Sequence, residues 1–239
     1  MTDSSPFLLR RPGVDATLAR ELAAAQWGMT GSVRELGSQQ DRNFAVVDAA
    51  SGLLLKIHHP STTADEIDLQ MLAARRLRAA GVRTPATLPA RDGAAPLAVV
   101  DAAGDPATAR AMELVEGASL ADAAAFDGAT AEELGAFAGR TVSALADVEH
   151  AAAERGIQWE LRRALEVVEA LVDELPAERR GACLRAARAA AARVDAVSAA
   201  LPLQVVHGDL TTDNVLRDAD GRLWLVDLGD VGRSWRVAE

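Results

Sequence analysis

The sequence predicts an α+β protein with a β-rich part that carries one main helix, followed by a mainly helical part. Three observations predict this class. Short apolar runs separated by turn-forming residues fill most of the chain before Gly117, as in an antiparallel sheet. Residues 119–200 then have the spacing of amphipathic helices. Short strand-like runs return after Pro202.

Local signals place the elements of the first part. A helix is expected over 15–27, with Asp15 at its N-cap. The runs SVRELG, NFAVVDA and GLLLKIHH have the length of strands. A helix should follow them, because Thr63 and Glu66 form a capping box and Gly81 is a typical stop. Further strands are expected in PLAVVDA and TARAMELV.

The second part should contain three helices, over 130–154, 158–175 and 177–200. Their alanine-rich amphipathic faces are ordinary core elements, so we assign them no chemistry. Short strands are expected in QVVHG, NVLR and LWLVD. The predicted organisation is a β-rich lobe over 1–112, a hinge over 113–117 and a helical lobe over 118–239.

Composition excludes several classes of protein. The chain has 239 residues, 49% of them hydrophobic, and a formal net charge of −10. It has no basic run, so we expect no nucleic-acid partner. It has no apolar stretch of membrane-spanning length and no signal-peptide pattern, so we expect a cytoplasmic protein without a membrane contact. Cys183 is the single cysteine and should be a buried structural thiol.

The segments HGDLTTDN and VDLGD flank a predicted β-hairpin, VLRDADGRLWLV, with its turn at 218–221. The hairpin should bring Asn214 and Asp227 side by side. Their carbonyl and carboxylate oxygens are ligands that suit Mg²⁺. Asp209 lies five residues before Asn214 and could accept a proton from a substrate hydroxyl. His207 is better interpreted as a residue that orients the loop.

These segments carry a family resemblance. The spacing from Asp209 to Asn214, followed by the turn led by Asp227, resembles the catalytic and metal loops of the kinase fold. With Gly208 after His207, HGDLTTDN resembles the aminoglycoside phosphotransferase and choline kinase superfamily. The combination of LGSQQDRNF, LLLKI and EIDLQ resembles its hydroxylysine-kinase and homoserine-kinase-like branch. The resemblance implies a protein-kinase-like two-lobed fold.

The resemblance also gives Lys56 a role. Lys56 is the only lysine in the sequence, while arginine supplies the rest of the 25 basic side chains. It lies in the third strand, where kinases place the lysine that binds the α- and β-phosphates. Its partner should be an acid on the following helix. Asp68 and Glu66 are the two candidate acids, and Gln70 is at the position where related kinases carry a glutamate. Because Glu66 is expected to cap the helix, Asp68 is the favoured partner of Lys56.

The implied activity is transfer of the γ-phosphoryl group of ATP to a hydroxyl of a small molecule, with Mg²⁺ as cofactor. Asp209 would be the base, and Asn214 and Asp227 would hold the metal. The loop around Ser38 would contact phosphates through its backbone, although it lacks a full glycine motif. Adenine would meet the backbone near Glu113 and Val115.

Three alternatives stand beside this interpretation. Relatives continue through further helices after the position of Glu239, so a missing segment or a partner is expected to complete the substrate pocket. The chain could then be a non-catalytic nucleotide-binding module or a fragment of a larger kinase. A metallohydrolase using His207 and Asp209 is disfavoured, because adjacent His58 and His59 point to opposite strand faces and should mark a solvated strand end.

Overall fold

The computed structural model describes residues 11–49, 51–122, 126–157 and 160–239. These residues form two units, one made of residues 1–71 and 85–117 and the other of residues 72–84 and 118–239. The first ten residues of the predicted β-rich lobe, and the first two of the helix predicted over 158–175, lie outside the described residues. Among the helices that are described, none has the length and apolar character needed to cross a bilayer.

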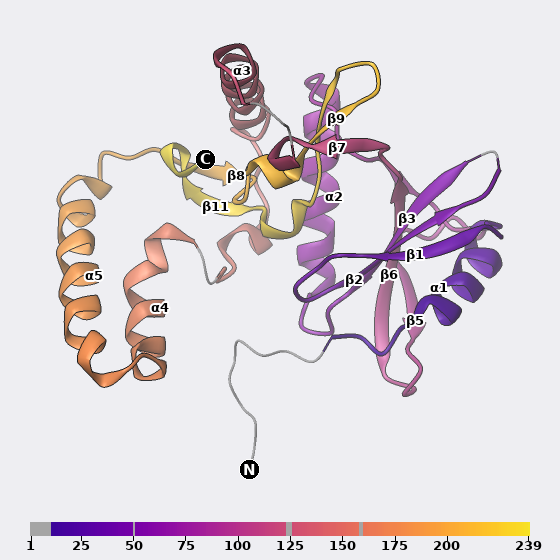
Figure 1. Ribbon diagram of the computed structural model, residues 1–239, viewed down its shortest axis with the longest axis horizontal. Helices are drawn as coiled ribbons and strands as arrows, with labels where there is room; N and C mark the ends of the chain where they lie inside the picture. The colour runs from indigo at the N-terminus through magenta and orange to yellow at the C-terminus, as the bar shows by residue number, and fades with distance from the viewer. Residues whose placement is uncertain (1–10, 50, 123–125, 158–159) are drawn as a thin grey trace. The chain divides into compact units, whose positions relative to one another are not determined.

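The first unit is an antiparallel sheet with one helix packed on a face (Figure 1). Its strand order is β1-β2-β3-β6-β4, and β5 also pairs with β6. The strands are β1 (Ser32–Leu36), β2 (Arg42–Val47), β3 (Gly52–His58), β4 (Thr87–Leu88), β5 (Leu97–Val100) and β6 (Pro106–Glu113). All three runs predicted as the first strands are confirmed.

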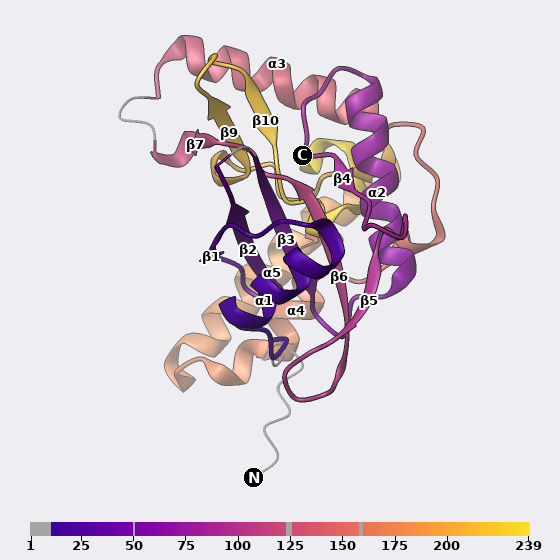
Figure 2. The same ribbon diagram turned by 90° about the vertical axis from the view of Figure 1, so that its right-hand side faces the viewer.

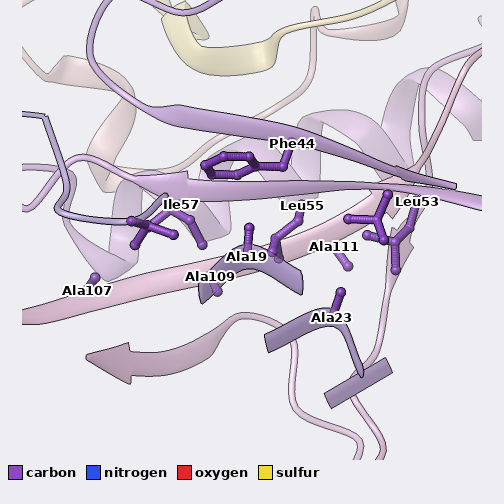
Figure 3. Close-up of a cluster of buried hydrophobic side chains, with 11 residues drawn as sticks. Ala19, Ala23, Phe44, Leu53, Leu55, Ile57, Ala107, Ala109 and Ala111 are labelled. Carbon is purple, nitrogen blue, oxygen red and sulfur yellow. The ribbon is translucent and has the colours of Figure 1, made fainter. Parts of the chain in front are cut away.

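A helix covers the apolar face of this sheet. α1 (Ala16–Leu22) begins at Asp15, whose carboxylate accepts the N–H groups of Thr17 and Leu18, and it continues as a π-helical turn over Ala23–Trp27. Figure 3 shows Ala19 and Ala23 of this segment directed toward the strand residues. The cluster they join is buried and joins strands β2, β3 and β6 to the helix; its larger members are Phe44, Leu53, Leu55 and Ile57.

The other face of β3 carries polar side chains that are equally buried. Lys56 and His58 alternate with Leu55 and Ile57 along the strand, and all four are less than 5% exposed. His59 is also buried, at 5% exposure. The prediction that the two histidines mark a solvated strand end is therefore wrong. The reason is tertiary: the backbone N–H of His59 donates to Asp41 at 2.8 Å, so another segment covers this end of the strand.

The helix predicted after the third strand is α2 (Ala64–Ala79). Its capping box is confirmed, because Glu66 accepts hydrogen bonds from the N–H and hydroxyl of Thr63 while the Thr63 hydroxyl accepts from the N–H of Glu66. The chain leaves the helix at Gly81, which has a φ of +78°. Residues 64–71 of α2 belong to the first unit and the rest to the second.

The second unit combines helices with two small sheets. Its strands are β7 (Gly117–Ser119), β8 (Leu203–Val206), β9 (Val215–Asp218), β10 (Leu223–Leu225) and β11 (Gly232–Trp235), with β10-β9-β7 in one sheet and β11-β8 in the other. Figure 2 shows α3 (Gly128–Ala144) beside the β9–β10 hairpin. Glu133 of α3 and Arg217 of β9 form an ion pair at 2.7 Å.

The helices predicted in this unit are shorter than expected. α3 ends at Ala144, and residues 151–154 form a separate 3₁₀ turn. No glycine or proline stops α3; the chain turns where Leu145 and Val148 become buried, at 0% and 3% exposure. The second predicted helix is reduced to α4 (Ala164–Leu171), flanked by 3₁₀ turns at Leu161–Arg163 and Val172–Glu174.

The third predicted helix is α5 (Ala177–Ser198), which has nearly the predicted bounds. It carries Cys183, whose side chain is half-buried rather than fully buried as expected. The helix has no fully buried residue, so the position of a thiol on it is only partly covered.

Short 3₁₀ turns complete the second unit, at Leu120–Asp122, Thr212–Asn214, Leu228–Asp230 and Arg236–Ala238. The predicted hairpin is confirmed: Leu225 pairs with Val215, and Leu223 with Arg217. Its turn is fixed by Asp218, whose side chain accepts hydrogen bonds from the N–H groups of Asp220 and Arg222. The hydrogen bond from the indole of Trp224 is the main reason that the pKa of Asp218 is lowered.

Candidate active site

The loop that carries Asp209 begins at the end of β8. Gly208 has a φ of +86°, a conformation that glycine adopts without strain. A Cβ atom at this position would lie 2.4 Å from the carbonyl oxygen of Asp230. The loop therefore passes so close to the turn after Asp227 that only a residue without a side chain fits.

His207 holds this loop from inside the second unit. Its side chain is completely buried. Its Nδ1 atom accepts the backbone N–H of Asp209 at 3.3 Å, and its Nε2 atom lies 3.2 Å from the carbonyl oxygen of Val226. An acceptor at Nδ1 places the ring proton on Nε2, which then donates to Val226. Both ring nitrogens thus have partners within the chain, which does not fit a metal ligand, and the orienting role of His207 stays a prediction.

Glu239 is a residue of this site that sequence reasoning missed. Its Oε1 atom accepts the N–H of His207 and its Oε2 atom accepts the N–H of Gly208, both at 3.0 Å. With His207 Nδ1 accepting from Asp209, three successive backbone N–H groups are bound by side-chain acceptors. No sequence signal connects an acid so far along the chain to this loop.

Asp209 and Asn214 are joined directly. The Nδ2 atom of Asn214 donates to Asp209 Oδ2 at 2.7 Å and to the Asp209 carbonyl oxygen at 2.9 Å. Both side chains are half-buried. Because the amide nitrogen is committed to Asp209, the amide orientation is set, and the Asn214 Oδ1 atom is the end available to other groups.

The hairpin brings Asn214 next to the residue before Asp227. The N–H of Val226 donates to the Asn214 carbonyl oxygen at 2.9 Å. Asp227 is exposed, has a φ of +55°, and accepts the N–H of Gly229 on its Oδ1 atom at 3.1 Å. It is the one non-glycine residue with positive φ among the described residues. Such conformations are concentrated at functional sites.

The donor types at this place fit a magnesium ion. A carboxylate and an amide oxygen supply hard oxygen ligands, and Mg²⁺ commonly takes one or two protein ligands of this kind together with waters and phosphates. Within the described ranges, no group of three or more His, Cys, Asp or Glu side chains could hold a metal ion by itself. The pair Asn214 and Asp227 would therefore need a phosphate-bearing ligand to complete the coordination.

Lys56 lies in the first unit and forms an ion pair that the sequence did not predict. Its Nζ atom is 3.0 Å from Asp41 Oδ2, and the two side chains are 5% and 15% exposed. Burial by itself raises the pKa of Asp41, but the charges of Lys56 and His58 and the hydrogen bond from the His59 N–H together lower it. Asp41 lies in the loop between β1 and β2, not on the helix where a partner was expected.

The other groups considered beside Lys56 have contacts of their own. Glu66 is held by Thr63 in the capping box. Gln70 is buried and accepts a hydrogen bond from Arg110 Nη2 at 2.8 Å. Arg110 lies opposite Lys56 in the pairing of β3 with β6. The role of Asp68, in the first turns of α2, stays a prediction.

The remaining predicted nucleotide contacts also belong to the first unit. Ser38 is half-buried in the loop between β1 and β2. Glu113 ends β6, and its N–H and carboxylate bond the carbonyl oxygen and N–H of Ala86. Val115 follows in the segment before β7. Lys56 and these residues are thus in one unit and Asp209, Asn214 and Asp227 in the other, so their meeting at one nucleotide stays a prediction.

Comparison with solved structures defines the class of protein. The chain is similar to an amicoumacin kinase, with 20% identity and a TM-score of 0.69 over 94% of this chain and 66% of that one. It is also similar to a microcompartment-associated aminopropanol kinase, with 18% identity and a TM-score of 0.62 over 93% and 71% of the two chains. Likenesses at these identities show the fold, which is kinase-like and α+β.

A third likeness is to an aminoglycoside 2′-phosphotransferase in complex with GDP, with 17% identity and a TM-score of 0.67 over 93% of this chain and 75% of that one. The family model for the phosphotransferase enzyme family, APH, matches residues 32–239. The chain therefore belongs to the phosphotransferase enzyme family, as its motifs predicted. The search of curated proteins gave no match. The chain spans about two thirds to three quarters of the length of these solved relatives.

Proposed function

We propose that this chain transfers the γ-phosphoryl group of ATP to a hydroxyl group of a small molecule, with Mg²⁺ as the metal. The observation that carries the proposal is the Asp209 loop. Asp209 is bonded to Asn214 at 2.7 Å, and Asn214 is bonded through its backbone to the residue preceding Asp227. The base and the two oxygen ligands that the chemistry needs thus come from one hydrogen-bonded segment.

Asp209 has the chemistry of the proton acceptor. As the acceptor hydroxyl attacks the γ-phosphorus, the bond between the γ-phosphorus and the β,γ-bridging oxygen breaks and ADP leaves. The hydroxyl proton passes to a carboxylate oxygen of Asp209. The hydrogen bond from Asn214 Nδ2 to Asp209 Oδ2 leaves the Oδ1 atom as the oxygen to receive the proton.

Asn214 and Asp227 would hold the metal through Asn214 Oδ1 and the Asp227 carboxylate. When bound, Mg²⁺ would neutralise charge on the β- and γ-phosphates. Lys56 would bind the α- and β-phosphates as a point charge, a task for which the planar fork of an arginine has a different geometry. The backbone near Ser38 would add phosphate contacts, and the segment from Glu113 to Val115 would meet the base of the nucleotide.

The relatives support this choice of ligands. The amicoumacin kinase was solved with AMP-PNP, Ca²⁺ and Ami, and another similar structure is a spectinomycin phosphotransferase with ADP and spectinomycin. The aminoglycoside 2′-phosphotransferase contains GDP. We propose ATP as the donor, and a hydroxyl-bearing small molecule such as an amino alcohol, a hydroxy amino acid or an aminoglycoside as the acceptor.

The test is direct measurement of phosphoryl transfer. The chain is incubated with γ-labelled ATP or GTP, with and without Mg²⁺, and with a panel of amino alcohols, hydroxylysine, homoserine and aminoglycosides. We expect Mg²⁺-dependent label on one class of acceptor, with ATP preferred. Binding of nucleotide without transfer to any acceptor would contradict the proposal and favour a non-catalytic nucleotide-binding module.

A further inference from the structure

We infer that Asp41, in the loop between β1 and β2, is the acid that positions the ammonium group of Lys56 for phosphate binding. The sequence predicted an acid on α2 for this task. Instead, Asp41 forms the ion pair with Lys56, and Asp41 lies in the same loop as Ser38, a proposed phosphate contact. This inference rests on the proposed function, because it assigns Lys56 its task, but the ion pair itself can be tested without any turnover.

The first argument is the burial of the pair. Lys56 Nζ and Asp41 Oδ2 are 3.0 Å apart, with side chains 5% and 15% exposed. The neighbouring pair of Arg42 and Glu35 has a similar separation but is 23% and 37% exposed. Water screens an exposed pair strongly, whereas a buried ammonium that loses its counter-ion is left in a medium that solvates it poorly. Asp41 therefore determines where the charge of Lys56 can lie.

The second argument is that Asp41 is itself held at two further points. Its Oδ1 atom accepts the N–H of His59 at 2.8 Å. Its carbonyl oxygen accepts hydrogen bonds from Nε and Nη2 of Arg11, at 3.2 and 2.9 Å. A carboxylate fixed to the end of β3 offers Lys56 one location, so the ammonium is oriented before a ligand arrives.

The third argument is the charge on this face of the sheet. Lys56 and His58 share one face of β3, and Arg110 lies opposite Lys56 on β6. All three are less than 5% exposed. Among the acceptors on this face, Gln70 is neutral and binds Arg110. The lowered pKa of Asp41 keeps its carboxyl ionised at neutral pH, so it offsets part of this buried positive charge.

One consequence concerns the loop between β1 and β2. Asp41 belongs to the same loop as Ser38, whose backbone is proposed to contact phosphates. The position of the loop and the position of Lys56 should therefore change together. Removing the charge of Asp41 should weaken binding of ATP and leave binding of adenosine, which lacks phosphates, nearly unchanged.

The composition of the chain supplies a sharp experiment. Because Lys56 is the only lysine, a protein grown with isotope-labelled lysine gives a single lysine side-chain signal in NMR spectra. We expect Asp41→Asn to move this signal and to lower the pH at which the ammonium loses its proton. Asp41→Glu should restore part of the wild-type behaviour. Asp173→Asn is the matched control, because it removes an exposed ion pair with Arg180 in the other unit, and it should leave the signal unchanged.

Asp68→Asn is the decisive comparison, because Asp68 was the acid favoured by the sequence. A larger effect of Asp68→Asn than of Asp41→Asn on the Lys56 signal would overturn the inference. So would an unchanged titration in Asp41→Asn. If Asp41→Asn does not fold, the pH dependence of the wild-type Lys56 signal tests the inference instead. The chemical shift of this signal should show an inflection at acidic pH, where Asp41 takes up a proton. A shift without this inflection would contradict the ion pair.

A double-substitution cycle tests whether Asp41 acts through Lys56. We expect Asp41→Asn to lower ATP affinity about tenfold in the wild type and to have no further effect in Lys56→Met. Independent, additive effects would contradict a positioning role. If ATP fails to perturb the Lys56 signal of the wild type, the proposed function fails, while the comparison of Asp41 with Asp68 can still be read from the lysine titration.

Discussion

Lys56 and Asp209 are held in place by different kinds of interaction. Lys56 lies in a central strand between buried apolar residues, and charged groups determine its position. Asp209 lies in a loop whose backbone N–H groups are bound by Glu239 and His207. The position of Lys56 should therefore depend on charge and pH, whereas the position of Asp209 should depend on the shape of its loop and on the hydrogen-bond acceptors around it. Variants of both can test this difference.

The largest effect is expected at Asp209. The substitution Asp209→Asn removes the proton acceptor but keeps the size of the side chain, so kcat should fall by about 10²–10⁴-fold. The affinity for ATP should change little, because Asp209 is assigned neither to the metal nor to the nucleotide. Steady-state transfer and calorimetric titration with ATP measure the two quantities. Unchanged turnover would remove Asp209 from its role.

The next effect concerns the shape of the loop. The substitution Gly208→Ala forces a side chain into a φ of +86° and places its Cβ atom against Asp230. The backbone strain alone should cost about 1–3 kcal/mol of unfolding free energy, and the overlap should add to it.

Gly221→Ala is the matched control for this prediction. Gly221 has a φ of +80°, and no atom lies within 4 Å of the position that a Cβ would take there. Urea unfolding of the two variants separates overlap from strain. An equal loss of stability in both would show that the contact with Asp230 relaxes without cost.

A smaller effect is expected from Glu239→Gln. A glutamine side chain keeps one acceptor oxygen, so one of the two hydrogen bonds to His207 and Gly208 is lost. We expect kcat to fall by about tenfold, corresponding to about 1.4 kcal/mol, with the KM for ATP unchanged. Glu154→Gln, which removes an exposed ion pair with Arg233 in the same unit, should leave both constants unchanged. A rise in the KM for ATP without a fall in kcat would contradict this assignment.

The smallest effect is a pH dependence specific to Asp41. Its pKa is lowered in the folded state, so its stabilising contribution is complete above about pH 4 and is lost as the pH falls through the folded value. Unfolding free energies measured between neutral and acidic pH should therefore decline less steeply in Asp41→Asn than in the wild type. Parallel pH profiles would show that Asp41 is not held by the charges around it.

The features that were predicted correctly are those determined by residues close together in the sequence. The capping box of Thr63 and Glu66, the hairpin turn at Asp218 and the first three strands all follow from neighbouring residues. The sequence did not reveal that Asp41 contacts Lys56, because that contact depends on the register of β2 with β3 and on how the preceding loop folds over the strand end.

The same distinction holds in the second unit. The motif around Asp209 predicted the hairpin that follows it, but it gave no information on Glu239, which reaches the loop through the pairing of β11 with β8. The early end of α3 could not be predicted either, because burial of Leu145 and Val148, rather than a helix-breaking residue, accompanies it.

The pairing of β8 with β11 has a consequence of its own. Val206 lies opposite Gly232, so one short ladder closes both ends of the stretch that contains His207, Asp209, Asn214 and Asp227. The chain between residues 207 and 231 thus leaves and rejoins the same two-stranded ladder of β8 and β11. Exchange of this stretch between relatives would need Glu239 as well, because its carboxylate lies beyond the ladder and accepts the N–H groups of His207 and Gly208.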